Sequence, residues 1–203
     1  QLDSDSWAVT GWSDGALAFG GTQTAGDYAR GLDNAGGVTS GGFYSFTNST
    51  TMSRTLGIQP GGGDWAPGTL TLRMTNQTGA TITQLDIAYD IWVNNDQGRS
   101  SSFNFSHSAD NSAYTAVGAM DLTSTAASDA LGFQLNSRST SLTGLSIADG
   151  AQYYIRWSGA DVGGSGSRDE FALDNISVTA VPEPTTFALL GIAAAALIRR
   201  RRV

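Results

Sequence analysis

One run of alternating side chains stands out in the chain: Gln84-Leu85-Asp86-Ile87-Ala88-Tyr89-Asp90-Ile91-Trp92-Val93. Large apolar residues occupy every second position from Leu85 to Val93, and mostly polar residues fill the positions between them. Because side chains alternate between the two faces of a β-strand, this period of two predicts a long strand with one buried face. Asp86, Asp90 and Trp92 are expected on its other face.

The same alternation recurs elsewhere, and turn-forming residues separate the segments. Apolar side chains alternate in three further stretches, at residues 70–74, 103–105 and 153–157. Segments rich in Asn and Gly at residues 76–79 and 94–98 predict turns. No helical period is evident before the C-terminal end. The sequence therefore predicts an all-β domain over residues 1–180, an antiparallel β-sandwich of the jelly-roll type.

The last predicted strand contains a change of phase. Phe171 and Leu173 share one phase, whereas the apolar residues from Ile176 to Ala180 share the other. One extra residue near Asp174 would return both sets to the same face, which is the effect of a β-bulge. Bulges often re-aim a side chain, so Asp174 is a candidate ligand. The alternative is a bulge that only twists the strand.

Composition excludes several kinds of chemistry. The 203 residues contain no cysteine and no lysine, which rules out disulfides, thiolate metal sites and Schiff-base catalysis. Residues 1–181 carry seven arginines and seventeen acidic residues, a formal net charge of −10. A domain so acidic is not expected to bind nucleic acid through its phosphates. Its acidity indicates either solubility outside the cell or cation binding.

Calcium is the cation that these residues suit best. Calcium prefers carboxylate and carbonyl oxygens as ligands. Asp3 and Asp5 lie near the N-terminus and Asp174 lies on the last predicted strand, so a structural Ca²⁺ is expected where the first and last strands meet. The alternative is that these aspartates serve in turns or pair with arginines.

Residues 181–203 differ from the rest of the chain. Val181-Pro182-Glu183-Pro184 precedes an apolar run at residues 187–198, and Arg199, Arg200, Arg201 and Arg202 follow it. Proline lacks the backbone donor that a central strand needs, so the last strand is predicted to end before this motif. The apolar run predicts a short hydrophobic helix about 18 Å long. The run has fewer residues than the ~20 that span a bilayer.

This order of proline motif, apolar helix and arginine cluster resembles the PEP-CTERM sorting signal. The resemblance implies export, transient contact with the inner membrane, and recognition by an exosortase that cleaves near the proline motif. The expected location is the cell surface or extracellular matrix of a Gram-negative-type bacterium. A plain tail anchor is the alternative. Residues 37–179 also resemble jelly-roll-like domains of unassigned activity that precede such tails, on blocks such as Gly41–Phe46 and Asp169–Ile176.

The first functional hypothesis is a non-enzymatic structural or matrix protein, associated with exopolysaccharide in a biofilm and able to self-associate. The alternative is a carbohydrate-binding module, since such sandwiches bind sugars through exposed aromatic rings. Trp65 in a glycine-rich loop, Trp92 and Tyr154 are its candidate ligand-binding residues. A loop or a second subunit covering that face would argue against this alternative.

Glycoside hydrolysis is the third hypothesis, and no catalytic residue is assigned. A glycosidase needs two carboxyl groups about 5–10 Å apart, and Glu170 is the only glutamate before the tail. His107 is the only histidine, and its serine neighbours would point to the opposite face of a strand. The sequence thus favours a protein that is not an enzyme.

Overall fold

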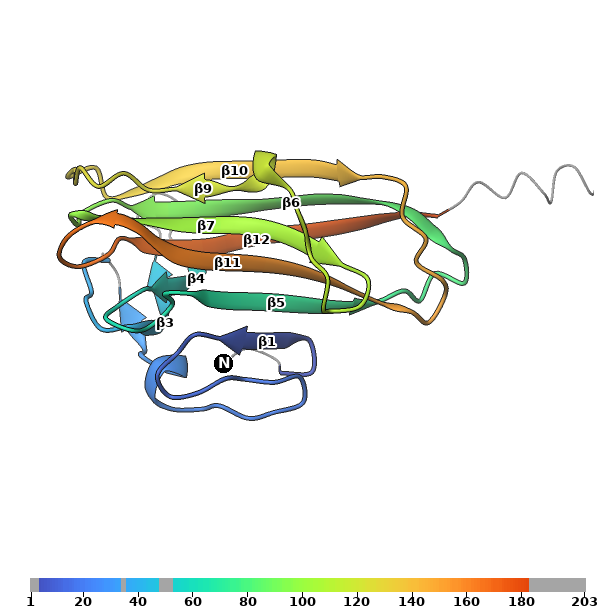
Figure 1. Ribbon diagram of the computed structural model, residues 1–203, viewed down its shortest axis with the longest axis horizontal. Helices are drawn as coiled ribbons and strands as arrows, with labels where there is room; N and C mark the ends of the chain where they lie inside the picture. The colour runs from blue at the N-terminus through green and yellow to red at the C-terminus, as the bar shows by residue number, and fades with distance from the viewer. Residues whose placement is uncertain (1–3, 34–35, 48–52, 183–203) are drawn as a thin grey trace, which may run out of the picture.

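The structure is a computed structural model that describes residues 4–33, 36–47 and 53–182, and it consists of two six-stranded sheets packed face to face (Figure 1). Sheet A has the order β1-β5-β11-β7-β8, and β9 also pairs with β7. Its strands are β1 (Trp7–Thr10), β5 (Gly68–Thr75), β7 (Arg99–Ser108), β8 (Thr115–Ala116), β9 (Leu122–Thr123) and β11 (Gln152–Gly164).

Sheet B has the order β10-β6-β12-β4-β3-β2. Its strands are β2 (Leu32–Asp33), β3 (Gly42–Thr47), β4 (Arg54–Gln59), β6 (Ile82–Asn94), β10 (Phe133–Leu142) and β12 (Glu170–Pro182). The long strands alternate between the sheets along the chain, and the ladders are antiparallel apart from the short parallel contact between β2 and β3. The predicted all-β, two-layered fold is confirmed. The predicted C-terminal helix lies outside the described residues.

The period-two pattern of β6 places its residues as expected. The alternating side chains Leu85, Ile87, Tyr89, Ile91 and Val93 face the core. There, the ring centroid of Tyr89 lies 5.3 Å from that of Trp157 and 5.5 Å from that of Phe105. Burying such large apolar side chains contributes roughly 1.5–3 kcal/mol each. Trp92 lies on the other face of β6, as the alternation predicts.

The last strand continues further than predicted. β12 runs to Pro182, two residues beyond the expected domain boundary, and Val181 pairs with Gln84 of β6. β4 pairs only with Phe171–Leu173 among the described residues, so the end of β12 has β6 alone as its neighbour. Proline is tolerated there because no donor is needed on the open side.

The N-terminal segment packs beside the sandwich, near β3 and β5 (Figure 1). The buried carboxylate of Asp27, in the 3-10 turn η1 (Gly26–Tyr28), holds this segment together. It accepts hydrogen bonds from the Ser13 hydroxyl and the Asp14 backbone and forms an ion pair with Arg30. These bonds lower the pKa of Asp27, although burial acts in the opposite direction and is the largest single effect. A second 3-10 turn, η2, spans Gly118–Met120.

Candidate functional site

Trp65 does not lie on an exposed loop, so its predicted role as a solvent-facing ring is wrong. Its exposed fraction is 0 %, and its ring centroid lies 5.1 Å from that of Trp12. The guanidinium group of Arg168 donates hydrogen bonds to the backbone carbonyls of Asp64 and Trp65, which holds the loop against the core. The glycine-rich sequence indicated flexibility, but these long-range contacts bury the ring.

Trp92 faces outward from sheet B, yet its ring is also covered. Its exposed fraction is 7 %, and it packs with Phe46 and Ala172 in a small second cluster. Val38 and Phe133 lie against this cluster from outside. Residues of the neighbouring strands, together with Val38 of the segment between β2 and β3, therefore cover the Trp92 ring.

Tyr154 lies on the outer face of sheet A and is 9 % exposed. Its ring centroid is 6.0 Å from that of Phe19, and its hydroxyl donates to the side-chain carbonyl of Gln152 at 2.6 Å. Trp65 therefore lies in the core, Trp92 lies on the outer face of sheet B, and Tyr154 lies on the outer face of sheet A. They do not form one binding site.

The predicted calcium ligands are also not brought together as expected. Asp174 lies on β12 in sheet B, whereas Asp5 precedes β1 of sheet A, because β1 pairs with β5 and not with the last strand. Within residues 4–33, 36–47 and 53–182, no three Asp, Glu or His side chains are grouped so that they could hold a metal ion. Asp3 lies outside the described residues, so a calcium site involving it stays a prediction.

The groups considered for hydrolysis are not arranged around an open cleft. Glu170 is fully buried, and burial together with neighbouring Asp96 raises its pKa to about 8. His107 shares a 2.6 Å hydrogen bond with the Tyr153 hydroxyl through Nδ1, and Ser108 donates instead to Asp110. Burial lowers the pKa of His107.

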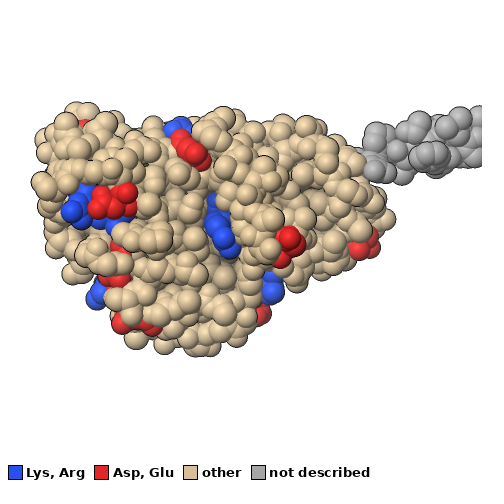
Figure 2. Space-filling view, in the orientation of Figure 1, with Lys and Arg blue, Asp and Glu red and all other residues tan. Residues whose placement is uncertain are grey.

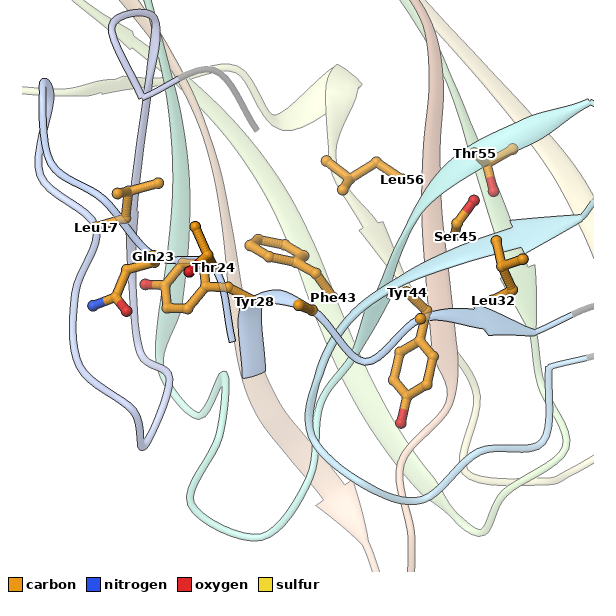
Figure 3. Close-up of a pocket in the computed structure, with 12 residues that line it drawn as sticks. Leu17, Gln23, Thr24, Tyr28, Leu32, Phe43, Tyr44, Ser45, Thr55 and Leu56 are labelled. Carbon is orange, nitrogen blue, oxygen red and sulfur yellow. The ribbon is translucent and has the colours of Figure 1, made fainter. Parts of the chain in front are cut away.

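The structure instead offers a pocket of about 420 Å³ between the N-terminal segment and the β2–β4 edge of sheet B (Figure 3). The rings of Tyr28 and Phe43 lie beside each other in it, with centroids 5.8 Å apart and planes inclined at 66°. Leu17 and Leu56 add further apolar surface. Its volume lies within the range of about 300–1,000 Å³ that small-molecule pockets have.

Uncharged polar side chains also line this cavity, which is called the edge pocket below. They are the side chains of Gln23, Thr24, Ser45 and Thr55. None of the described residues that line the pocket carries a charge. The Tyr28 hydroxyl donates to the Gly15 carbonyl at 2.9 Å, and burial raises the pKa of Tyr28 to about 12, so this phenol stays neutral. The edge pocket therefore suits an uncharged ligand with apolar faces and hydroxyl groups.

Sequence reasoning missed the edge pocket because its residues come from separate parts of the chain. Phe43 and Ser45 share one face of β3, which their spacing indicates. Gln23, Thr24 and Tyr28 lie in a segment with little regular structure, and no local pattern predicts where such a segment packs. The contacts of η1 with β3 and the pairing of β2 with β3 bring the two halves together.

Comparison with known families identifies the C-terminal end. Residues 180–202 match the model of the PEP-CTERM protein-sorting motif. The chain carries a PEP-CTERM sorting motif. Val181 and Pro182 of this motif form the end of β12, and Glu183, Pro184 and Arg199–Arg202 lie outside the described residues. The motif marks an exported, surface-sorted protein and implies processing by an exosortase. No helix among the described residues is long and apolar enough to cross a membrane.

No curated protein matches the chain. Similar solved structures include a carbohydrate-binding module specific for non-crystalline cellulose, with 13% identity over 71% of this chain and 85% of the other and a TM-score of 0.41. A second is the N-terminal cellulose-binding domain of a Cellulomonas fimi β-1,4-glucanase, with 14% identity over 66% and 83% and a TM-score of 0.38. A third is an exo-β-agarase, with 12% identity over 71% and 22% and a TM-score of 0.42. At such identities a similar sandwich does not imply a similar ligand.

Proposed function

We propose that this PEP-CTERM protein is a non-enzymatic carbohydrate-binding protein of the cell surface, and that the edge pocket takes an uncharged sugar unit. The observation that carries the proposal is the combination of aromatic rings, hydroxyls and an amide with no charged side chain. Only 8 % of Tyr28 and 5 % of Phe43 is exposed, so these rings form the apolar floor of the pocket, against which the C–H groups of a sugar can pack. Its hydroxyls need hydrogen-bond partners once they leave water, and Gln23, Thr24 and Ser45 can supply them.

Surface sorting supports this proposal because it delivers the protein to the place where extracellular polysaccharide accumulates. Binding one sugar unit in a small pocket gives weak affinity, and many copies on one surface strengthen it by multivalency. A matrix role, with retention in exopolysaccharide, follows from the same binding. The burial of Glu170 supports a protein that holds its glycan without cleaving it.

Blocking the edge pocket tests this function. Thr24 lines the pocket and is exposed, so Thr24→Trp places a large ring in the opening without disturbing the core. The full chain is expected to bind a neutral polysaccharide in pull-down and calorimetric titration, and Thr24→Trp to weaken binding by about tenfold or more, which is the effect of losing about 1.4 kcal/mol. No reducing sugar should be released.

The matched control is Thr143→Trp, since Thr143 is also exposed but lies in the connection between β10 and β11. This variant should bind like the unaltered protein. The proposal is wrong if no neutral polysaccharide binds, or if both tryptophan variants behave alike.

A further inference from the structure

The two outer faces of the sandwich differ in charge. Outward positions on sheet B include Asp86 and Asp90 of β6. On sheet A, β1, β5, β7 and residues 152–160 of β11 contain no acidic residue. Arg73 and Arg156 are instead on the outer face of that sheet, opposite the core-facing alternation of β5 and β11. A cationic face is unexpected in a chain whose net charge is −7.

The register of sheet A places the two arginines close to each other. Arg73 of β5 is opposite Tyr154 of β11, and Arg156 of β11 is opposite Thr71 of β5. Both arginines are thus on one face as a diagonal pair on neighbouring strands, a position in which residues are about 7–8 Å apart. One extended ligand along this face could contact both.

An aromatic ring holds each guanidinium group in place. The guanidinium carbon of Arg73 lies 4.4 Å from the centroid of Phe19, and that of Arg156 lies 3.6 Å from the centroid of Tyr114. Such cation–π contacts fix the plane of the group before any ligand arrives. Less side-chain entropy is then lost on binding.

Neither arginine has a carboxylate partner among the described residues. Arg73 donates from its side chain to the Asp5 carbonyl. Arg156 donates to the Thr71 hydroxyl at 2.9 Å and weakly to the Asn111 amide oxygen at 3.4 Å. Because a guanidinium group carries five N–H donors, both side chains keep donors for a further acceptor.

Partial burial of Arg156 strengthens the electrostatic attraction between this face and an anion. Burial lowers the pKa of Arg156, although an arginine remains charged in proteins. A charge that has lost part of its water interacts more strongly with an opposite charge than a fully hydrated one does. Asp110, in the segment between β7 and β8 that also carries Tyr114, already accepts hydrogen bonds from Ser108, Ser112 and Ala113.

We propose that the outer face of sheet A binds a carboxylated polysaccharide, with Arg73 and Arg156 receiving carboxylates of its uronate units. A planar guanidinium matches a carboxylate with two parallel hydrogen bonds. Around the pair, Thr69, Ser106 and Ser158 supply hydroxyls for the uncharged part of the sugar. Figure 2 shows the charged side chains of the face in view as scattered groups, red and blue, separated by uncharged surface. This site is independent of the edge pocket.

A second copy of the chain fits this face less well. The acidic face of sheet B would have to supply the carboxylates, and those of Asp86 and Asp90 are already engaged. Asp86 accepts from Ser141 at 2.6 Å and from Gln84, and Asp90 accepts from Ser137 and Asn175. A uronate chain brings carboxylates that have only water as a partner.

The test compares glycans that differ only in charge. The full chain is titrated with polygalacturonate, with its uncharged methyl ester and with neutral dextran. Polygalacturonate is expected to bind more tightly than either neutral glycan, and Thr24→Trp should remove only the binding of neutral glycans at the edge pocket. Increasing salt should weaken the binding of polygalacturonate because exposed charges are screened. The double variant Arg73→Gln and Arg156→Gln should lose about tenfold or more in affinity, since hydrogen bonds to charged groups are the stronger class.

The matched control is the double variant Arg54→Gln and Arg138→Gln, which makes the same charge change on β4 and β10 of sheet B. It should bind polygalacturonate like the unaltered chain, and thermal melting should confirm that both variants fold. Equal binding of the methyl ester, salt-independent binding or equal loss in both variants would each overturn the proposal. The proposal would also be overturned if light scattering showed that the chain self-associates through these arginines and does not bind uronate. The Thr24→Trp variant should keep this affinity, which separates the two sites.

Discussion

Arg168 and Asp169 directly precede Glu170, the first residue of β12, and all three residues are almost fully buried. Asp169 accepts a hydrogen bond from the Gln97 backbone at 3.1 Å, and Glu170 accepts one from the Asn94 amide at 3.1 Å. In the described part of the chain, one carboxyl oxygen of each has no hydrogen-bond partner. Burial therefore raises the pKa of both carboxyls, and nearby Asp96 adds to the effect.

The raised pKa of Glu170 predicts a stability that falls with pH. In the folded state the carboxyl stays protonated up to about pH 8, whereas in the unfolded state it ionises near its ordinary value of 4.5. The unfolded state thus binds fewer protons in this interval, so the free energy of unfolding decreases as pH rises through it and levels off above it. Glu170→Gln keeps a neutral side chain of similar shape and should flatten this decrease, as measured by urea unfolding at several pH values.

Asp169 acts in the same direction, because its pKa is also raised, so some slope should remain in the Glu170 variant. Asp96→Asn removes the neighbouring charge without touching Glu170 itself, and should shift the decrease to lower pH. Identical pH profiles for Glu170→Gln and the unaltered protein would contradict the assignment.

At the scale of the element, β12 shows how much a local pattern can predict. Its change of phase indicates a bulge near Asp174, and the register with β6 does shift between Asp174 and Ser177. The bulge turns both apolar sets toward the same core: Phe171 and Leu173 before it, and Ile176, Val178 and Ala180 after it. The re-aimed side chain is Asn175, which donates to Asp90 at 2.8 Å and takes a φ of 51°.

The backbone at Asn175 gives a test of the bulge. A positive φ suits Gly or Asn but strains a β-branched residue. Asn175→Val should therefore lower the free energy of unfolding by about 1–2 kcal/mol more than Asn175→Gly does. Both variants lose the bond to Asp90, so their difference in thermal or chemical unfolding isolates the backbone conformation. Equal stability would argue against a left-handed residue here.

At the scale of the molecule, β12 connects the folded domain directly with the sorting motif. Pro182 ends the strand, and Glu183 follows at once. The domain therefore remains intact if processing occurs after this point, and loss of the four terminal arginines leaves it with a net charge of −10 over residues 1–181. Release from the motif thus makes the exported domain more acidic.

Processing predicts a shorter mature chain. Intact mass spectrometry of protein extracted from the cell surface should give a mass that lacks Arg199–Arg202. The double variant Glu183→Ala and Pro184→Ala alters the motif but not β12, and it should keep the full-length mass. Thr185→Ala with Thr186→Ala serves as the neighbouring control and should be processed normally. A surface form that retains the arginines would contradict exosortase processing.

The sequence by itself determined the strands β5, β6, β7, β11 and β12, the bulge and the sorting motif, because each is a local pattern of residue spacing. It did not predict β10, whose ten residues lack a clear apolar alternation. Tertiary structure decided which aromatic rings meet water. Trp65 is inside because Arg168, far along the chain, donates to its carbonyl, and Trp92 is covered by residues of other strands. It also decided that Arg73 and Arg156 share one face without acidic partners. Burial and pairing depend on which distant segments pack together, and no single segment encodes them.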